Sequence, residues 1–269
     1  MSSTQENAMS QNDLNINTRD VFREFSDDGY VAFKPLLSQN EVATLNTEIA
    51  RFIKDVVPTM PATQVYYEDK SDKSTLKQLQ KMFEYDSYFE DLMLAGPARK
   101  IAEEVLQDEV VPINMQYFNK PAGIGQATPP HQDGYYFHLT PCEAVTGWLA
   151  LEDVNEENGC IHYVRGSHKV DSFRNHGQTG VLGFSQGITD FGTDDDQAQS
   201  VACPGSAGTF LMHHAKTIHW AGANQSKVRS RRALGFIYYA KNTKIDIAAK
   251  EAYQTYLDKH LKNSSKIGH

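Results

Sequence analysis

A histidine and an aspartate two residues apart, His131 and Asp133, stand in a stretch of the chain that reads as an extended strand. In an extended chain, side chains at positions i and i+2 point to the same side, so both can reach one metal ion. Two histidine nitrogens and one carboxylate oxygen on one face of Fe(II) leave positions open for other ligands. The pair alone is a weak motif, because a His–Asp hydrogen bond in a turn has the same spacing. A second histidine is therefore required.

Candidates for that second histidine lie close together downstream: His213, His214 and His219. Their positions alone do not choose among them. Three arginines follow His219 by ten to thirteen residues and lead into a predicted strand: Arg229, Arg231 and Arg232. A hairpin here would place an arginine beside a histidine, where a guanidinium can bind a carboxylate bidentately near the metal. A keto acid that chelates iron at one end needs such a cation at its other end, which favours His219.

The composition limits the class of protein. The 269 residues are 40% hydrophobic, enough to bury one sizeable core, and the formal net charge is −8. That charge argues against broad attraction to nucleic acid or an anionic membrane, and no apolar run is long enough to span a bilayer. The three cysteines suggest neither a disulfide framework nor a zinc motif. We expect a soluble cytoplasmic protein that acts on a small molecule, and its oligomeric state stays open.

The chain divides into a flexible N-terminal tail, residues 1–17, and one domain over residues 18–269. Capping residues and apolar periodicity predict three helices in the first part of the domain, and a fourth, amphipathic helix is expected near the end. Their expected bounds are Thr18 to Gly29, a helix after the Ser38/Glu41 capping box, Pro97 to Gln107, and Lys241 to Lys262.

From about residue 109 the sequence changes to short β-prone runs separated by turn residues. The runs are Val110–Phe118, Ala144–Leu151, Cys160–Val164, Thr209–His213, Thr217–Trp220 and Ala233–Ala240. This spacing predicts a mainly β domain with flanking helices (α+β), built as a sandwich or jelly roll. The Gly-rich, acidic segment 169–200 is expected to be a long loop that can act as a lid, with 194–196 as a hydrated acidic run.

Successive blocks of the chain resemble the phytanoyl-CoA dioxygenase family, in order, from about Asp20 to Tyr239. The matching blocks are Pro130–Phe137, Val145–Asp153, Glu157–Cys160 with Arg165–His168, and His219 through Leu234. Any one block would be a weak match, but their joint order and spacing are specific.

The resemblance implies a double-stranded β-helix core of cupin type. It also implies dependence on Fe(II), 2-oxoglutarate and O₂, with hydroxylation of an unactivated C–H bond and release of succinate and CO₂. By position, the metal ligands are His131, Asp133 and His219. Arg231 matches the residue that binds the distal carboxylate of 2-oxoglutarate, and Trp148, Met115 and Lys77 match further contacts of this co-substrate.

The chain departs from the family pattern at two places. A serine that touches 2-oxoglutarate often follows the distal histidine by two residues, but this chain has Ala221. The resemblance therefore implies that this hydrogen bond is absent or supplied elsewhere. Arg165 replaces the proline usual before Gly-Ser-His. Because the carboxylate is retained at Asp133, the halogenating variant of the family is not expected.

Candidates for substrate contact follow the ligand pair directly or carry polar groups near the expected mouth of the site: Tyr135, Tyr136, His138, Gln116 and Tyr66. Their chemistry favours a small polar substrate over a long acyl chain. The alternative is a non-redox, cupin-like protein that binds zinc or another small ligand, because two histidines and a carboxylate also suit Zn²⁺. In that case Arg231 would have no purpose.

Overall fold

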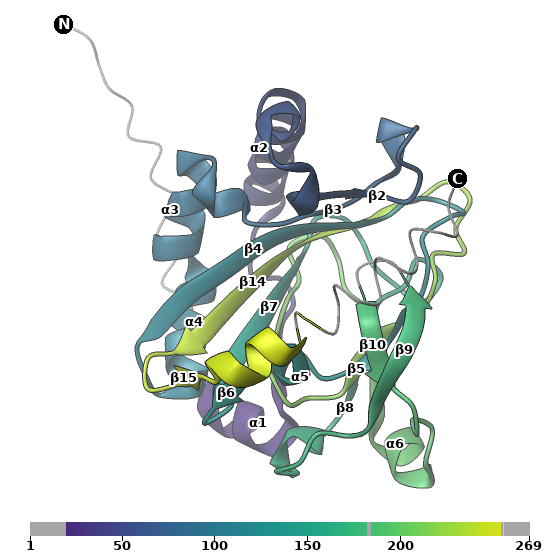
Figure 1. Ribbon diagram of the computed structural model, residues 1–269. Helices are drawn as coiled ribbons and strands as arrows, with labels where there is room; N and C mark the ends of the chain where they lie inside the picture. Colours follow the sequence, from purple (N-terminus) through teal and green to yellow (C-terminus); the bar gives the residue numbers. More distant parts are fainter. Residues whose placement is uncertain (1–19, 182–183, 254, 256–269) are drawn as a thin grey trace, which may run out of the picture.

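The computed structural model describes residues 20–181, 184–253 and 255, and its largest element is a seven-stranded antiparallel sheet (Figure 1). The sheet's strands are, in spatial order, β1 (Tyr30–Phe33), β12 (Phe210–His214), β7 (Ala144–Ala150), β14 (Arg231–Ala240), β4 (Val110–Lys120), β3 (Leu76–Leu79) and β2 (Val65–Tyr67). The central strand β14 pairs with β4 on one side and β7 on the other.

A second, four-stranded sheet has the order β11 (Ser200–Cys203), β8 (Ile161–Val164), β13 (His219–Ala221) and β5 (Thr128–His131). Two strand pairs complete the β structure: β9 (His176–Val181) with β10 (Phe184–Ile188), and β6 (Leu139–Thr140) with β15 (Lys244–Ile245). The predicted double-stranded β-helix is confirmed.

Four helices accompany the large sheet: α1 (Val21–Asp28), α2 (Gln39–Asp55), α3 (Ser87–Ala95) and α4 (Pro97–Leu106). Shorter helices are α5 (Gly134–Phe137), α6 (Asp194–Gln199) and 3-10 turns at Val57–Thr59, Ala62–Gln64, Lys73–Thr75, Met82–Glu84 and Ser167–Lys169. The capping box of α2 forms as predicted, with Ser38 and Glu41 bonded to each other's backbone. Asp20 caps α1, and the predicted cap Thr18 lies outside the described residues.

The two faces of the large sheet have different neighbours, because side chains alternate along each strand. Leu234, Phe236 and Tyr238 of β14 join the main hydrophobic cluster with buried residues of α2, α3 and α4. Arg231 and Ile237 of the same strand instead line a cavity, together with residues of the small sheet. The helices therefore close one face of the sheet, and the other face forms a wall of the site.

The segment 169–200 differs from the predicted loop. It folds into the β9–β10 pair and helix α6. The acidic run 194–196 forms the first turn of α6, in which Asp194 and Asp195 are exposed, as expected for a hydrated run, but Asp196 is buried. The Asp196 carboxylate accepts hydrogen bonds from the backbone N–H of Gly192 and Thr193 and pairs with Arg174. Asp196 is thus buried because, at the third helical position, its carboxylate caps the start of α6 together with Thr193.

The C-terminal part is helical only in part. Lys244–Ile245 forms strand β15 where the sequence predicted helix, and residues 247–253 and 255 are helical. The remainder of the predicted helix, like the predicted tail at 1–17, lies outside the described residues.

Candidate metal and co-substrate site

The two histidines of the predicted triad lie directly opposite each other on paired strands. His131 ends β5, His219 begins β13, and the two are register partners with ring centroids 4.1 Å apart. Nδ1 of His131 lies 2.8 Å from the Pro129 carbonyl oxygen, and Nδ1 of His219 lies 2.9 Å from that of Thr217. A carbonyl partner fixes the proton on Nδ1, so Nε2 of each ring is left as a metal ligand.

Asp133 completes the triad from the turn between β5 and α5. Its Oδ1 lies 3.3 Å from Nε2 of His131 and 3.7 Å from Nε2 of His219. The ligand atoms of the three residues lie within 4.8 Å of one another, and no other such group occurs among the described residues. Burial would raise the pKa of Asp133, but the neighbouring histidines outweigh it and hold this pKa well below the usual range. The donor set fits an Fe(II) facial triad.

The second oxygen of Asp133 is held from the large sheet. Thr146 of β7 donates a hydrogen bond of 2.6 Å to Oδ2, and Nε2 of His213 on β12 lies 3.2 Å from the same atom. Nδ1 of His213 lies 2.9 Å from the hydroxyl oxygen of Tyr163. With Oδ2 occupied, Oδ1 is the oxygen presented to a metal. Thr146 and His213 are thus positioning residues that the sequence analysis did not assign.

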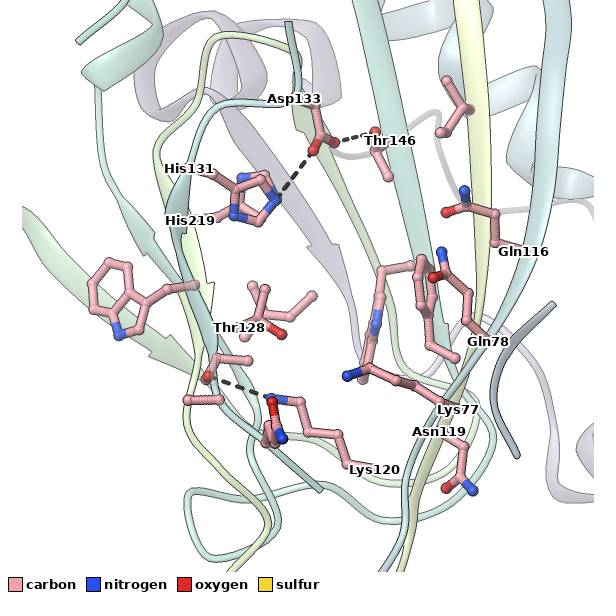
Figure 2. Close-up of a pocket in the computed structure, with 18 of the residues that line it drawn as sticks. Lys77, Gln78, Gln116, Asn119, Lys120, Thr128, His131, Asp133, Thr146 and His219 are labelled. Carbon is pink, nitrogen blue, oxygen red and sulfur yellow. Dashed lines mark hydrogen bonds and ion pairs between the residues drawn. The ribbon is translucent and has the colours of Figure 1, made fainter. Parts of the chain in front are cut away.

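The triad opens into a cavity of about 370 Å³ between the two sheets. Figure 2 shows the ligands on one wall, with the ends of Lys77 and Lys120 farther down the cavity. Arg231 lies on this cavity and is itself buried, and its guanidinium carbon is 5.4 Å from the centre of the Trp148 ring.

The end of the cavity around Arg231 and Lys77, here called the cationic end, has more basic than acidic side chains. Burial lowers the pKa of Arg231 to about 10, and its Nε has no hydrogen-bond partner in the described part of the chain. Lys77 is paired with Glu68 at 3.2 Å. A buried guanidinium with an unused N–H is costly unless a ligand pairs with it, and a carboxylate has the matching geometry. The residues present thus fit a dicarboxylate whose near end reaches the metal.

Most predicted site residues share this cavity, but not all. The predicted site residues that line it are His131, Asp133, His219, Arg231, Trp148, Lys77, Gln116 and Tyr136. Met115 does not line it and lies instead in the main hydrophobic cluster. The prediction that Met115 contacts the co-substrate is wrong by one residue. Side chains alternate along β4, and the neighbouring Gln116 is the one on the cavity side.

Three predicted substrate residues also lie away from the cavity wall. Tyr66 uses its hydroxyl to donate to the Thr63 carbonyl. Tyr135 stacks on His176 with ring centroids 4.0 Å apart. The His138 ring packs near Tyr253. None of the three is among the lining residues in the described part of the chain, so direct substrate contact by them gains no support.

The cavity also includes residues that the sequence analysis did not assign, among them Lys120, Gln78 and Tyr253. The sequence spacing could have predicted the position of Lys120, because this residue follows Gln116 by four residues on one strand and so shares its face. No sequence pattern could have predicted Tyr253 as a lining residue, because it reaches the cavity from the C-terminal segment, far along the chain from the other site residues. His213 lies on the cavity face of β12, and its neighbour His214 is buried on the other side near Phe25.

A jelly-roll core that presents two histidines and a carboxylate to a cavity with a buried cation is the architecture of the non-haem iron- and 2-oxoglutarate-dependent dioxygenases, and this chain is an enzyme of that class. Within the class it belongs to the phytanoyl-CoA dioxygenase (PhyH) family, whose protein-family model matches residues 25–233. The family resemblance predicted from the sequence is thereby confirmed.

Relatives of this chain carry several names. It is 27% identical over 238 residues to the phytanoyl-CoA dioxygenase domain-containing protein 1 homolog of Caenorhabditis elegans, covering 86% of this chain and 79% of that protein. It is 25% identical over 214 residues to a probable alpha-ketoglutarate-dependent hypophosphite dioxygenase of Stutzerimonas stutzeri, covering 78% and 74%.

Solved structures share the fold at low identity. EctD from S. alaskensis with bound Fe has a TM-score of 0.69 at 20% identity, covering 87% of this chain and 80% of EctD. The epimerase SnoN in complex with Fe3+, alpha ketoglutarate and nogalamycin RO has a TM-score of 0.67 at 22% identity, covering 84% of each chain. No helix among the described residues is long and apolar enough to cross a bilayer.

Proposed function

We propose that this enzyme hydroxylates an unactivated C–H bond of a small polar substrate, with His131, Asp133 and His219 as iron ligands and Arg231 binding the distal carboxylate of 2-oxoglutarate. The observation that carries the proposal is the buried Arg231, whose Nε has no partner, in the same cavity as the triad. When bound, the iron supplies O₂ activation while 2-oxoglutarate is converted to succinate and CO₂.

The protein's own residues contribute orientation and exclusion of water. The Trp148 ring supports the Arg231 guanidinium at 5.4 Å, which limits the directions in which its N–H groups can point. Thr146 and His213 hold Asp133 in one orientation. Because these groups are buried, their interactions with a charged co-substrate are stronger than they would be in water.

The substrate side of the cavity supports a small polar compound. Gln116, Gln78 and Tyr136 line it, and a volume of about 370 Å³ is near the lower end for ligand pockets. Two similar proteins are associated with small polar compounds. The relative from Stutzerimonas stutzeri is named for hypophosphite, and a structure of EctD contains 5-hydroxyectoine. A third was solved with nogalamycin RO.

The proposed cytoplasmic location rests on the three free cysteines.

A zinc-binding, non-redox role is the competing candidate, because the same three ligands suit Zn²⁺. It leaves the cationic end of the cavity without a ligand. Metal analysis after anaerobic purification, together with binding of 2-oxoglutarate, separates the two. A protein that retains zinc and does not bind 2-oxoglutarate would favour the alternative.

The central test is succinate formation by the iron-loaded enzyme with 2-oxoglutarate and O₂. Stimulation is screened across amino acids, phosphonates, quaternary amines and acyl-CoAs. His131→Ala and Asp133→Ala are expected to abolish succinate formation, because each removes a ligand. Asp171→Ala, at a fully exposed aspartate, is the matched control and should behave as wild type. Full activity of either ligand variant with iron present would overturn the assignment.

A further inference from the structure

A second buried basic side chain lies beside Arg231. Lys120 is the last residue of β4 and the register partner of Arg231 on β14. Directly opposite residues of an antiparallel pair project from the same face, with Cβ atoms roughly 5 Å apart. Lys120 lines the cavity and is only 6% exposed.

The lysine stem occupies a space made by glycines. A Cβ at Gly125 would lie 2.6 Å from Cβ of Lys120, and one at Gly159 would lie 3.4 Å from its Cδ. Gly159 also has a φ of +87°, which disfavours any side chain. Nζ donates to the Gly222 carbonyl at 2.6 Å and lies 3.4 Å from that of Ala221. Once protonated, the amine has three donors, so one remains for an acceptor other than these two carbonyl groups.

The charges around Lys120 do not balance it. The groups that face it are Arg231 from β14, Lys77 from β3, and Glu68, which follows β2 and is already paired with Lys77. Lys120 itself forms no ion pair in the described part of the chain. Burial first, and then Arg231 and Lys77, lower the pKa of Lys120 to about 6. At neutral pH its amine is therefore mostly uncharged until an anion arrives.

We propose that Lys120 binds the distal carboxylate of 2-oxoglutarate together with Arg231, and that its amine takes up one proton from solvent when this carboxylate enters. The amine becomes an ammonium ion, and no other bond changes. The Lys120 amine lies 3.4 Å from the carbonyl oxygen of Ala221, two residues after the metal ligand His219. The inference rests on the proposed role of Arg231.

Calorimetry of 2-oxoglutarate binding to the iron-loaded protein, without O₂ and in buffers of different ionisation enthalpy, tests the proposal. At pH 7.5 the wild type should take up close to one proton per 2-oxoglutarate. Its apparent Kd should rise by up to about tenfold per pH unit above about 6, because binding requires a protonated amine. Lys120→Met should bind at least roughly tenfold more weakly, as expected for the loss of a charged hydrogen bond, with no proton uptake and a flat pH profile.

Two controls separate the possible outcomes. Lys241→Met, at an exposed lysine, should keep wild-type affinity and proton uptake. Arg231→Met should lose affinity, and wild-type affinity in this variant would overturn the proposed function itself. If Arg231→Met binds weakly while Lys120→Met keeps wild-type proton uptake, only the role of Lys120 fails. Absence of proton uptake by the wild type overturns the inference even if Lys120→Met does not fold.

Discussion

Each histidine ligand is oriented by the carbonyl group two residues before it in the chain. His131 uses Pro129 and His219 uses Thr217. In both cases Nδ1 faces the carbonyl oxygen and Nε2 is left toward the other ligands. Burial first, and then the neighbouring His213 and His131, also lower the pKa of His219 well below its usual range. The ring is therefore neutral, which is the form that binds a metal.

At the same scale, Thr146 is expected to tune metal affinity through Asp133. Thr146→Val keeps the shape of the side chain but removes the 2.6 Å hydrogen bond to Oδ2. We expect the Kd for Fe(II) or Co(II) to rise roughly tenfold or more, as for other groups that orient metal ligands. Anaerobic titration of the metal measures this change.

Thr209→Val is the matched control for that prediction. Thr209 is also buried, but its hydroxyl has no hydrogen-bond partner among the described residues. Its replacement should leave the metal Kd unchanged. Equal Kd values for Thr146→Val and wild type would show that Thr146 does not orient the carboxylate.

At the scale of the element, strand β4 serves both the core and the site. Met115 and Tyr117 belong to the main hydrophobic cluster, and Gln116, Phe118 and Lys120 line the cavity. Because the side-chain period of a strand is two residues, an alignment error of one residue exchanges a core residue for a site residue. The predicted role of Met115 failed for this reason.

Adjacent substitutions on β4 should consequently have different effects. Met115→Ala should lower the free energy of unfolding by about 2–5 kcal/mol, as for a large core side chain, with unchanged 2-oxoglutarate affinity in the folded protein. Gln116→Leu should change stability little but raise KM for the substrate. Urea unfolding and steady-state kinetics measure the two effects. A normal KM for Gln116→Leu would remove this residue from the substrate site.

At the scale of the whole molecule, the large sheet couples the site to the fold. It is packed by helices on one face and lines the cavity with the other, so ligands that bind the cavity stabilise the packed sheet. A ligand at 100 times its Kd adds about 2.7 kcal/mol to the free energy of unfolding. For a chain of this length that is roughly a 5–10 °C rise in Tm.

Thermal denaturation without O₂ should therefore show two successive increases in Tm, one with iron and one with added 2-oxoglutarate. Excess EDTA should reverse the first, and the second should require Arg231. Asp133→Ala should show no increase with iron. If 2-oxoglutarate raised the Tm of Arg231→Met as much as that of wild type, the distal carboxylate would bind elsewhere.

Local signals predicted much of the architecture. The capping box at Ser38 begins α2, Pro97 begins α4, and the alternating strands from residue 110 form the jelly roll. The segment 169–200 was not predictable in the same way. Its β9–β10 pair has a Gly-rich composition that also suits a loop, and the burial of Asp196 depends on Arg174, twenty-two residues away.

The sequence by itself pointed to the chemistry: His131 and Asp133 share a face by their i, i+2 spacing, and the order of the family pattern selected His219 and Arg231. The tertiary structure decided which other groups meet them. Thr146 and Lys120 reach the site only because β7 and β4 both pair with β14 in one register. Register between strands distant in sequence is set by packing of the whole sheet, so no local pattern specifies it.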